Sequence, residues 1–338
     1  MIRRFATALG VMSLILGLAQ AAEAQDKIKV KMSEVVRSQF YVPMYVALTK
    51  GFVAEEGLDV DLITANGGDR VGAMILSDQA DFALAGPEVP IYIYNGESPD
   101  KPLIFCALTA TDGLFLASRQ KIEPFSWSAL NGKKIMGWRP GSTPELYLEY
   151  VLKKNGVEAD TIKNIITNIS PAARDGAWLA GTADFGIFNE PNLTTLENAG
   201  QLHFFASVGK EVGRADYTAF FAKKSWLEKH GDIAQKWTNA IARAQAWVKT
   251  APEKDIADAV MPFFPGLSLA DNIAVVNRYR TVGVPIWATS PVVDEAGLAK
   301  LQEIMVVGGV LPEDKKLTYD QLVTNVYATK AQQKFASE

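Results

Sequence analysis

A short segment of this chain occurs twice, about a hundred residues apart. Residues 75–84 read Ile-Leu-Ser-Asp-Gln-Ala-Asp-Phe-Ala-Leu, and residues 178–187 read Trp-Leu-Ala-Gly-Thr-Ala-Asp-Phe-Gly-Ile. Each copy has the pattern of a helix end, a polar turn, an Ala-Asp-Phe step and an apolar strand. A supersecondary unit that is used twice predicts two similarly built α/β lobes that face each other, and such lobes commonly enclose a ligand cleft.

Strand-like and helical patterns alternate along the chain in two series. The strand-like segments are residues 28–32, 58–63 and 82–84 in the first series and 135–138, 162–169, 185–187 and 201–207 in the second. Helical patterns lie between them, and this alternation favours a mainly parallel, doubly wound sheet in each lobe. From Lys224 onward the pattern is mostly helical.

The chain is expected to cross between the lobes twice, near residues 109–113 and 208–216. Residues 217–222 resemble the strand-like run 114–117 and are expected to pair with it as a return strand. Paired crossings of this kind are natural hinges. The predicted domain organisation places residues 25–110 and 215–338 in lobe 1 and residues 111–214 in lobe 2.

Residues 1–24 have the features of a cleaved export signal. Arg3 and Arg4 form a positive start, residues 9–18 are apolar, and Ala22-Glu23-Ala24 matches an A-x-A cleavage site. Cleavage near Ala24 would leave a net charge of about −5, which does not favour nucleic acid or an anionic membrane surface. We therefore expect a mature periplasmic protein that neither inserts into a membrane nor binds nucleic acid.

The residues that most often serve nucleophilic or zinc chemistry are scarce in this chain. Cys106 is the single cysteine and lies in an apolar run, while His203 and His230 lack the spacing of metal ligands. No G-x-S-x-G segment predicts a serine nucleophile. We therefore expect no catalytic residue, no metal and no cofactor.

In open α/β sheets, ligands bind at the carboxyl ends of strands, where helix N-termini present free N–H groups. This rule selects six loops of the sequence. They are residues 38–41, 67–69, 86–88, 109–112, 141–143 and 189–191. The first of these adds the aromatic rings of Phe40 and Tyr41, which could either face the cleft or pack in the core.

Several of these loop residues could have either a structural role or a ligand-binding role. Thr143, before Pro144, could cap its helix or contact a ligand, and the same choice applies to Asp69. Glu88 and Glu190 follow the two copies of the repeat and could cap helices or point at one ligand. Paired carboxylates also occur in glycosidases. Trp138 could stack on a ligand or pack between the lobes.

The chain resembles the periplasmic substrate-binding proteins of ABC importers for nitrate, sulfonates, taurine and thiamine-pyrimidine precursors. The resemblance spans about residues 28–225 and is carried by a set of short motifs. They are Gln39-Phe40-Tyr41-Val42-Pro43-Met44-Tyr45-Val46-Ala47-Leu48, Lys50-Gly51-Phe52, Glu55-Glu56-Gly57-Leu58, Gly67-Gly68, Gln79-Ala80-Asp81-Phe82, Leu130-Asn131-Gly132-Lys133-Lys134-Ile135, Gly141-Ser142 and Ala183-Asp184-Phe185.

The resemblance implies a type II periplasmic-binding-protein fold, a monomer whose two lobes close on a small molecule and then dock on a membrane permease. By position, the family's pocket would involve Gln39, Phe40, Tyr41, Gly68, Gly86, Glu88, Ser142, Thr143 and Glu190. The rule on strand ends adds Asp69 and Thr109 to these candidates.

The sequence leaves the ligand open. Aromatic rings with Asp69, Glu88 and Glu190 suit a nitrogen-containing aromatic compound, such as a pyrimidine precursor of thiamine, because carboxylates accept its N–H donors. A sulfonate or nitrate would instead need helix N-termini and a cation. The alternatives to a transport receptor are a secreted enzyme on the same fold and a sensor subunit. The family's desulfinase depends on a cysteine near the first helix, which this chain lacks.

Overall fold

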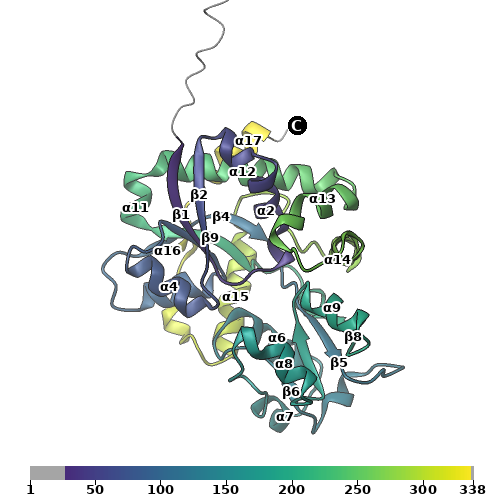
Figure 1. Ribbon diagram of the computed structural model, residues 1–338. Coiled ribbons are helices and arrows are strands. Elements are labelled where there is room, and N and C mark those ends of the chain that lie inside the picture. Colours follow the sequence, from purple (N-terminus) through teal and green to yellow (C-terminus); the bar gives the residue numbers. More distant parts are fainter. Residues whose placement is uncertain (1–26, 336–338) are drawn as a thin grey trace, which may run out of the picture.

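The computed structural model describes residues 27–335 and contains two α/β lobes, each built around its own sheet (Figure 1). The predicted signal at residues 1–24 lies outside the described residues. The strand order is β2-β1-β3-β9-β4 in the first sheet and β6-β7-β5-β8 in the second. The predicted α/β architecture of two lobes is therefore present. The expectation of a mainly parallel sheet in each lobe is wrong, because both sheets are mixed.

The sheet of lobe 1 is parallel at one edge and antiparallel at the other. Strand β1 (Ile28–Glu34) pairs in parallel with β2 (Leu58–Thr64) and β3 (Phe82–Ala85). Strand β9 (Thr218–Lys223) is antiparallel to both β3 and β4 (Pro102–Thr109). The prediction that residues 217–222 pair with 114–117 is therefore wrong: the chain has already crossed back when β9 forms.

The sheet of lobe 2 contains β5 (Phe115–Ser118), β6 (Ile135–Met136), β7 (Phe185–Phe188) and β8 (His203–Ser207). Strand β5 is antiparallel to β7 and β8, and β6 is parallel to β7. The strand predicted at residues 162–169 is absent: helix α7 (Ala159–Lys163) covers its start, and Ile166 makes only an isolated bridge to Met136. Short apolar runs fit a helix and a strand equally well, which explains the error.

Helices cover both sheets, and those after residue 224 pack mainly on lobe 1 (Figure 1). The helices of lobe 1 are α2 (Val42–Thr49), α3 (Phe52–Glu55), α4 (Gly68–Leu76), α5 (Glu88–Asn95), α11 (Lys224–Lys229), α12 (Gly231–Thr250), α13 (Glu253–Val260), α14 (Leu269–Thr281), α15 (Glu295–Val307), α16 (Tyr319–Leu322) and α17 (Val326–Phe335). Those of lobe 2, besides α7, are α6 (Thr143–Lys154), α8 (Arg174–Leu179), α9 (Asn192–Asn198) and α10 (Val208–Val212). Within residues 27–335, no helix combines the length and the apolar character that a membrane span needs.

The two copies of the repeated segment form the same structure in the two lobes. In each lobe the aspartate of Ala-Asp-Phe binds the backbone of the neighbouring parallel strand. The backbone N–H of Lys31 donates to Asp81 Oδ2 at 2.7 Å, and that of Lys134 donates to Asp184 Oδ2 at 3.0 Å. The aspartate of each copy therefore joins the start of its own strand, β3 or β7, to the neighbouring parallel strand or the residue just before it.

The turn inside each copy also has the same backbone conformation. Asp78 and Gly181 occupy matching positions and adopt left-handed φ angles of 58° and 80°. A residue with φ in this range ends a helix and turns the chain toward the next strand. The shared turn supports a common construction of α4-β3 and α8-β7.

The two lobes are joined where the chain crosses between the sheets. At the end of β4, Thr109 Oγ1 accepts from the backbone N–H of Thr218 at 2.9 Å. The next residue, Ala110, accepts from the N–H of Ala215 at 3.1 Å. The two crossings thus lie side by side, so the carboxyl ends of β3 and β7 can face each other across a cleft.

Two glycines of helix α8 and its turn give a matched stability test. We expect Gly181→Ala to lower the free energy of unfolding by about 1 kcal/mol, because φ is 80° and an L side chain is strained there. Gly176→Ala lies within the helix and should raise stability by roughly 0.5–1 kcal/mol. A Cβ at either position meets no atom within 4 Å.

Urea unfolding of the two variants measures this difference directly. Because neither substitution adds a contact, the opposite signs would come from the backbone alone. Equal effects of the two substitutions would contradict the role of the left-handed turn.

Candidate functional site

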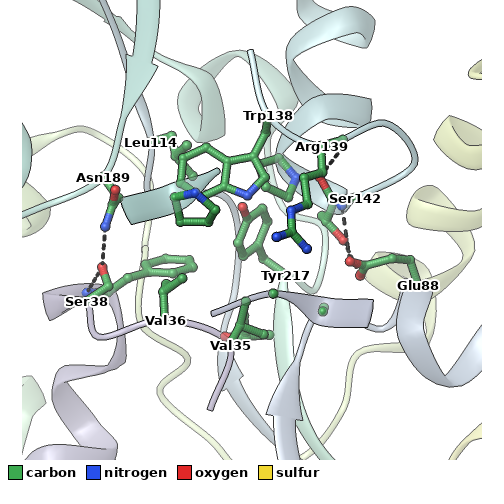
Figure 2. Close-up of a pocket in the computed structure, with 18 of the residues that line it drawn as sticks. Val35, Val36, Ser38, Glu88, Leu114, Trp138, Arg139, Ser142, Asn189 and Tyr217 are labelled. Carbon is green, nitrogen blue, oxygen red and sulfur yellow. Dashed lines mark hydrogen bonds between the residues drawn. The ribbon is translucent and has the colours of Figure 1, made fainter. Parts of the chain in front are cut away.

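A cavity of about 70 Å³ lies between the two lobes, at the carboxyl ends of their strands (Figure 2). Loops of both lobes contribute to its walls. The lining residues are Val35, Val36, Ser38, Phe40, Tyr41, Gly67, Gly68, Gly86, Glu88, Leu114, Trp138, Arg139, Ser142, Thr143, Pro144, Pro171, Asn189, Tyr217 and Thr218. The cavity therefore lies where the rule on strand ends predicts a site.

Aromatic rings form a large part of the cavity wall. Phe40 and Tyr217 pack edge to face with ring centroids 5.0 Å apart, and Tyr41 lies beside Phe40. Trp138, from lobe 2, lies opposite Val35 and Val36 of lobe 1 (Figure 2). These rings give the cavity flat apolar surfaces that suit an aromatic ligand.

The Trp138 ring is held from behind by a buried arginine. The guanidinium carbon of Arg174 lies 4.1 Å from the ring centroid, and its nitrogens donate to the carbonyls of Gly137 and Ile187. Glu145 accepts a hydrogen bond from the backbone N–H of Trp138. Desolvation lowers the pKa of Arg174 to about 10. The side chains of Arg174 and Glu145 thus both position Trp138.

Glu88 joins the two lobes inside the cavity. It begins α5 of lobe 1, and its Oε1 accepts from the backbone N–H of Thr143 at 3.2 Å. The Thr143 hydroxyl donates to Oε2 of the same carboxylate. Figure 2 shows Glu88 directed at the loop that carries Ser142. Burial raises the pKa of Glu88, while the hydrogen bonds from Thr143 act in the opposite direction.

A second set of contacts between the lobes lies at the outer edge of the cavity. Arg139 of lobe 2 forms an ion pair with Asp69 of α4. The hydroxyl of Tyr92 donates to the carbonyl of Gly141 at 2.7 Å. These contacts hold the loop at residues 139–142 against lobe 1, so the two lobes touch directly at this edge of the cavity.

On the opposite side of the cavity, the loop after β7 meets the loop after β1. Ser38 Oγ donates to the carbonyl of Glu190 at 2.8 Å, and Asn189 Nδ2 donates to Ser38 Oγ at 3.3 Å. Asn189 and Gly86 hold matching positions of the repeat, one residue past each strand, and both line the cavity. The repeat therefore supplies one edge of the cavity from each lobe.

Most of the predicted site residues come together at this cavity. Its lining includes Phe40, Tyr41, Gly68, Gly86, Glu88, Ser142 and Thr143. Thr143 is the first residue of α6 and Ser142 is the N-cap, without a side-chain hydrogen bond to the helix. Thr143 therefore does not cap its helix, because its hydroxyl binds Glu88 instead.

Four predicted residues lie outside the lining. Gln39 is buried and donates from Nε2 to Asn272 Oδ1 at 2.6 Å. Thr109 binds Thr218 at the crossing between the lobes. Asp69 lies at the outer edge, in its ion pair with Arg139. The fourth, Glu190, differs most from the expectation.

The Glu190 side chain is buried and does not line the cavity. Its Oε2 accepts from the backbone N–H of Thr194 at 3.0 Å, and Oε1 lies 3.0 Å from the guanidinium of Arg278. Glu88 and Glu190 thus do not face a common cavity. The glutamate is the third residue of the loop Gly86-Pro87-Glu88 but the second residue of the loop Asn189-Glu190-Pro191. Only Glu88 lines the cavity.

The sequence did not single out Tyr217 and Asn189. Asn189 lies in a predicted strand-end loop, but the prediction named the adjacent Glu190 instead. Tyr217 lies just before β9. Because the sequence analysis paired β9 with the wrong strand, it did not place Tyr217 at the cleft. Among residues 27–335, no group of three or more His, Cys, Asp and Glu side chains is arranged to hold a metal ion.

The buried Glu145 predicts a pH dependence of stability. Desolvation raises its pKa from 4.5 to about 8, so between these values the folded protein binds a proton that the unfolded chain has released. Its contribution to the free energy of unfolding is therefore present at low pH and is lost as the pH rises toward 8. The free energy of unfolding of the wild-type protein should therefore fall between pH 6 and pH 8. We expect this fall to be smaller in Glu145→Gln by on the order of 1–2 kcal/mol.

Urea unfolding at both pH values measures this slope, with Glu303→Gln on the exposed face of α15 as the control. A slope in Glu145→Gln equal to that of the control would contradict the assignment.

Comparison with known proteins finds one matching family model and similar full-length proteins. The model described as NMT1/THI5 like matches residues 39–255. Putative binding protein YtlA of Bacillus subtilis is 38% identical over 322 residues, which cover 95% of this chain and 95% of that protein. The family match includes the cavity-lining residues from Phe40 to Thr218, but not Val35, Val36 and Ser38.

Two solved structures share the fold over almost the entire chain. A protein from Bordetella bronchiseptica RB50 has a TM-score of 0.75 at 23% identity, with 92% of this chain and 99% of that chain covered. The periplasmic nitrate-binding protein NrtA of Synechocystis has a TM-score of 0.73 at 17% identity, with 93% and 90% covered. The architecture of two lobes is therefore that of periplasmic binding proteins.

Proposed function

The chain belongs to the NMT1/THI5-like family of substrate-binding proteins, and we propose that it binds a nitrogen-containing heteroaromatic compound in the periplasm. The two lobes close on this ligand, and the closed protein delivers it to the permease of an ABC importer. A pyrimidine that carries an amino group, such as a thiamine precursor, is the ligand class that the cavity suits best.

The observation that carries the choice of ligand is the position of the Glu88 carboxylate. It occupies the N-terminus of α6, where the backbone N–H of Thr143 would otherwise be free to bind an anion. A negatively charged ligand would have to displace this carboxylate or lie beside it. An amino group, in contrast, donates to the carboxylate and gains a charge-assisted hydrogen bond.

The cationic groups near the cavity are already engaged by protein partners. Among the described lining residues, Arg139 alone carries a positive charge, and it is paired with Asp69. Arg174 lies behind Trp138 and donates to backbone carbonyls. A nitrate or sulfonate would therefore have to displace Asp69 from Arg139 and lie near the buried Glu88 carboxylate, which makes the anion alternative the weaker one.

The aromatic walls support a flat ligand. Trp138 is fixed by Arg174 on one face, and Phe40 is fixed by Tyr217, so little side-chain entropy is lost when a ring stacks there. The polar groups of Ser38 and Asn189 lie at the other end of the cavity and can orient ring nitrogens.

Thermal unfolding with a panel of compounds tests the ligand class. We expect 4-amino-5-hydroxymethyl-2-methylpyrimidine to stabilise the protein by about 2.7 kcal/mol when its concentration is a hundred times its Kd. Nitrate and taurine should leave the midpoint unchanged. A shift with either anion and none with any aminopyrimidine would contradict the proposal.

Titration calorimetry tests the role of the carboxylate. We expect Glu88→Gln to weaken binding of the aminopyrimidine by about 10- to 100-fold, the loss of one hydrogen bond to a charged group. Glu190→Gln is the matched control, because that buried carboxylate lies outside the lining. It should lower the stability of the protein and leave the affinity unchanged, whereas equal losses of affinity would refute the assigned role of Glu88.

A further inference from the structure

A larger groove of about 490 Å³ opens outward from the ligand cavity. Four residues, Gly68, Glu88, Arg139 and Ser142, line both the cavity and the groove. The groove follows helices α4 and α5 of lobe 1, and the loop at residues 139–142 of lobe 2 forms its other wall. The two spaces are therefore neighbouring parts of one cleft.

The floor of the groove is apolar, and its small residues leave a space that larger side chains border. Gly72 and Ala73 of α4 leave room, and a Cβ at Gly72 would already lie 3.4 Å from Cγ1 of Val89. Leu76 at the end of α4 and Tyr92 of α5 border this space and are 44% and 38% exposed. Large apolar side chains left partly exposed around a concave space indicate a binding surface.

The junction between the two spaces is polar and open to solvent. The Arg139 and Asp69 side chains that meet there are 31% and 67% exposed. An exposed ion pair contributes little to stability, so it can shift aside at small cost when a ligand passes. The hydroxyl of Tyr92 holds the loop at Gly141 nearby, which completes the groove when the lobes are together.

Size separates the two spaces. The inner cavity of about 70 Å³ fits a small flat ring, whereas pockets for larger organic ligands measure about 300–1,000 Å³. The groove lies within that range. A ligand whose ring occupies the inner cavity can thus carry a substituent that leaves past Arg139 and lies along α4 and α5.

We infer that the groove binds an apolar substituent of the same ligand, so that the transported compound is a heteroaromatic ring with an alkyl or aryl chain. This inference rests on the proposed function for the ring itself. The occupant is part of the ligand because the groove is continuous with the cavity and shares its lining. At its outer end the groove reaches Glu97 and Ser98, where a chain would meet solvent.

Titration calorimetry with 4-aminopyrimidine and derivatives that carry n-butyl or n-hexyl at carbon 2 or carbon 5 tests the inference. One of the two series should bind about fourfold more tightly per added methylene, the factor that corresponds to roughly 0.8 kcal/mol for each buried methylene. Ala73→Trp, on the exposed side of α4, should abolish this gain and leave binding of unsubstituted 4-aminopyrimidine intact.

Ala299→Trp, at an exposed position of α15 outside the groove, is the matched control and should keep the gain. If the unsubstituted ring binds but neither chain adds affinity, the groove inference is wrong and the proposed function stands. The same holds if Ala73→Trp and Ala299→Trp behave alike.

If no aminopyrimidine binds, the proposed ring is contradicted, and a second probe then tests the groove by itself. The uncharged dye N-phenyl-1-naphthylamine becomes fluorescent in apolar surroundings. Binding that is lost in Ala73→Trp and kept in Ala299→Trp would support the groove as a site for apolar groups. No binding to the wild-type protein, or equal binding to both variants, would overturn the inference.

Discussion

The contact between Glu88 and Thr143 determines both how the lobes meet and what the cleft can hold. Its two hydrogen bonds join the N-termini of α5 and α6, one from each lobe. Because the carboxylate is buried, it must be paired with donors, and a ligand with N–H groups can supply them as well as Thr143 does. Closure and choice of ligand therefore depend on the same side chain.

The repeated unit explains why the contact can form. Asp81 and Asp184 fix the starts of equivalent strands, and the left-handed turns at Asp78 and Gly181 direct the chain into them. Each strand then ends at the cleft with a short loop. The loops are free to differ once the strands are placed, and their differences, rather than the shared core, give the cavity its chemistry.

The sequence predicted the two lobes and much of the cavity wall, because the repeat and the strand-end loops are local patterns. It could not predict the contacts of Glu190 or Gln39. Their partners, Arg278 and Asn272, come from helix α14, about 90 and 230 residues further along the chain. It also misplaced β9, because an apolar run shows that a strand forms but not which strand it pairs with.

The compound that co-purifies with the protein, identified by mass spectrometry after gentle isolation and denaturation, tests the central claim most directly. A ring with N–H donors to Glu88 and an apolar substituent is the expected result, because such a compound fills the cavity and the groove together. Recovery of nitrate, a sulfonate or another anion in stoichiometric amount would contradict it, since the carboxylate at the N-terminus of α6 would then have to yield its place to a like charge.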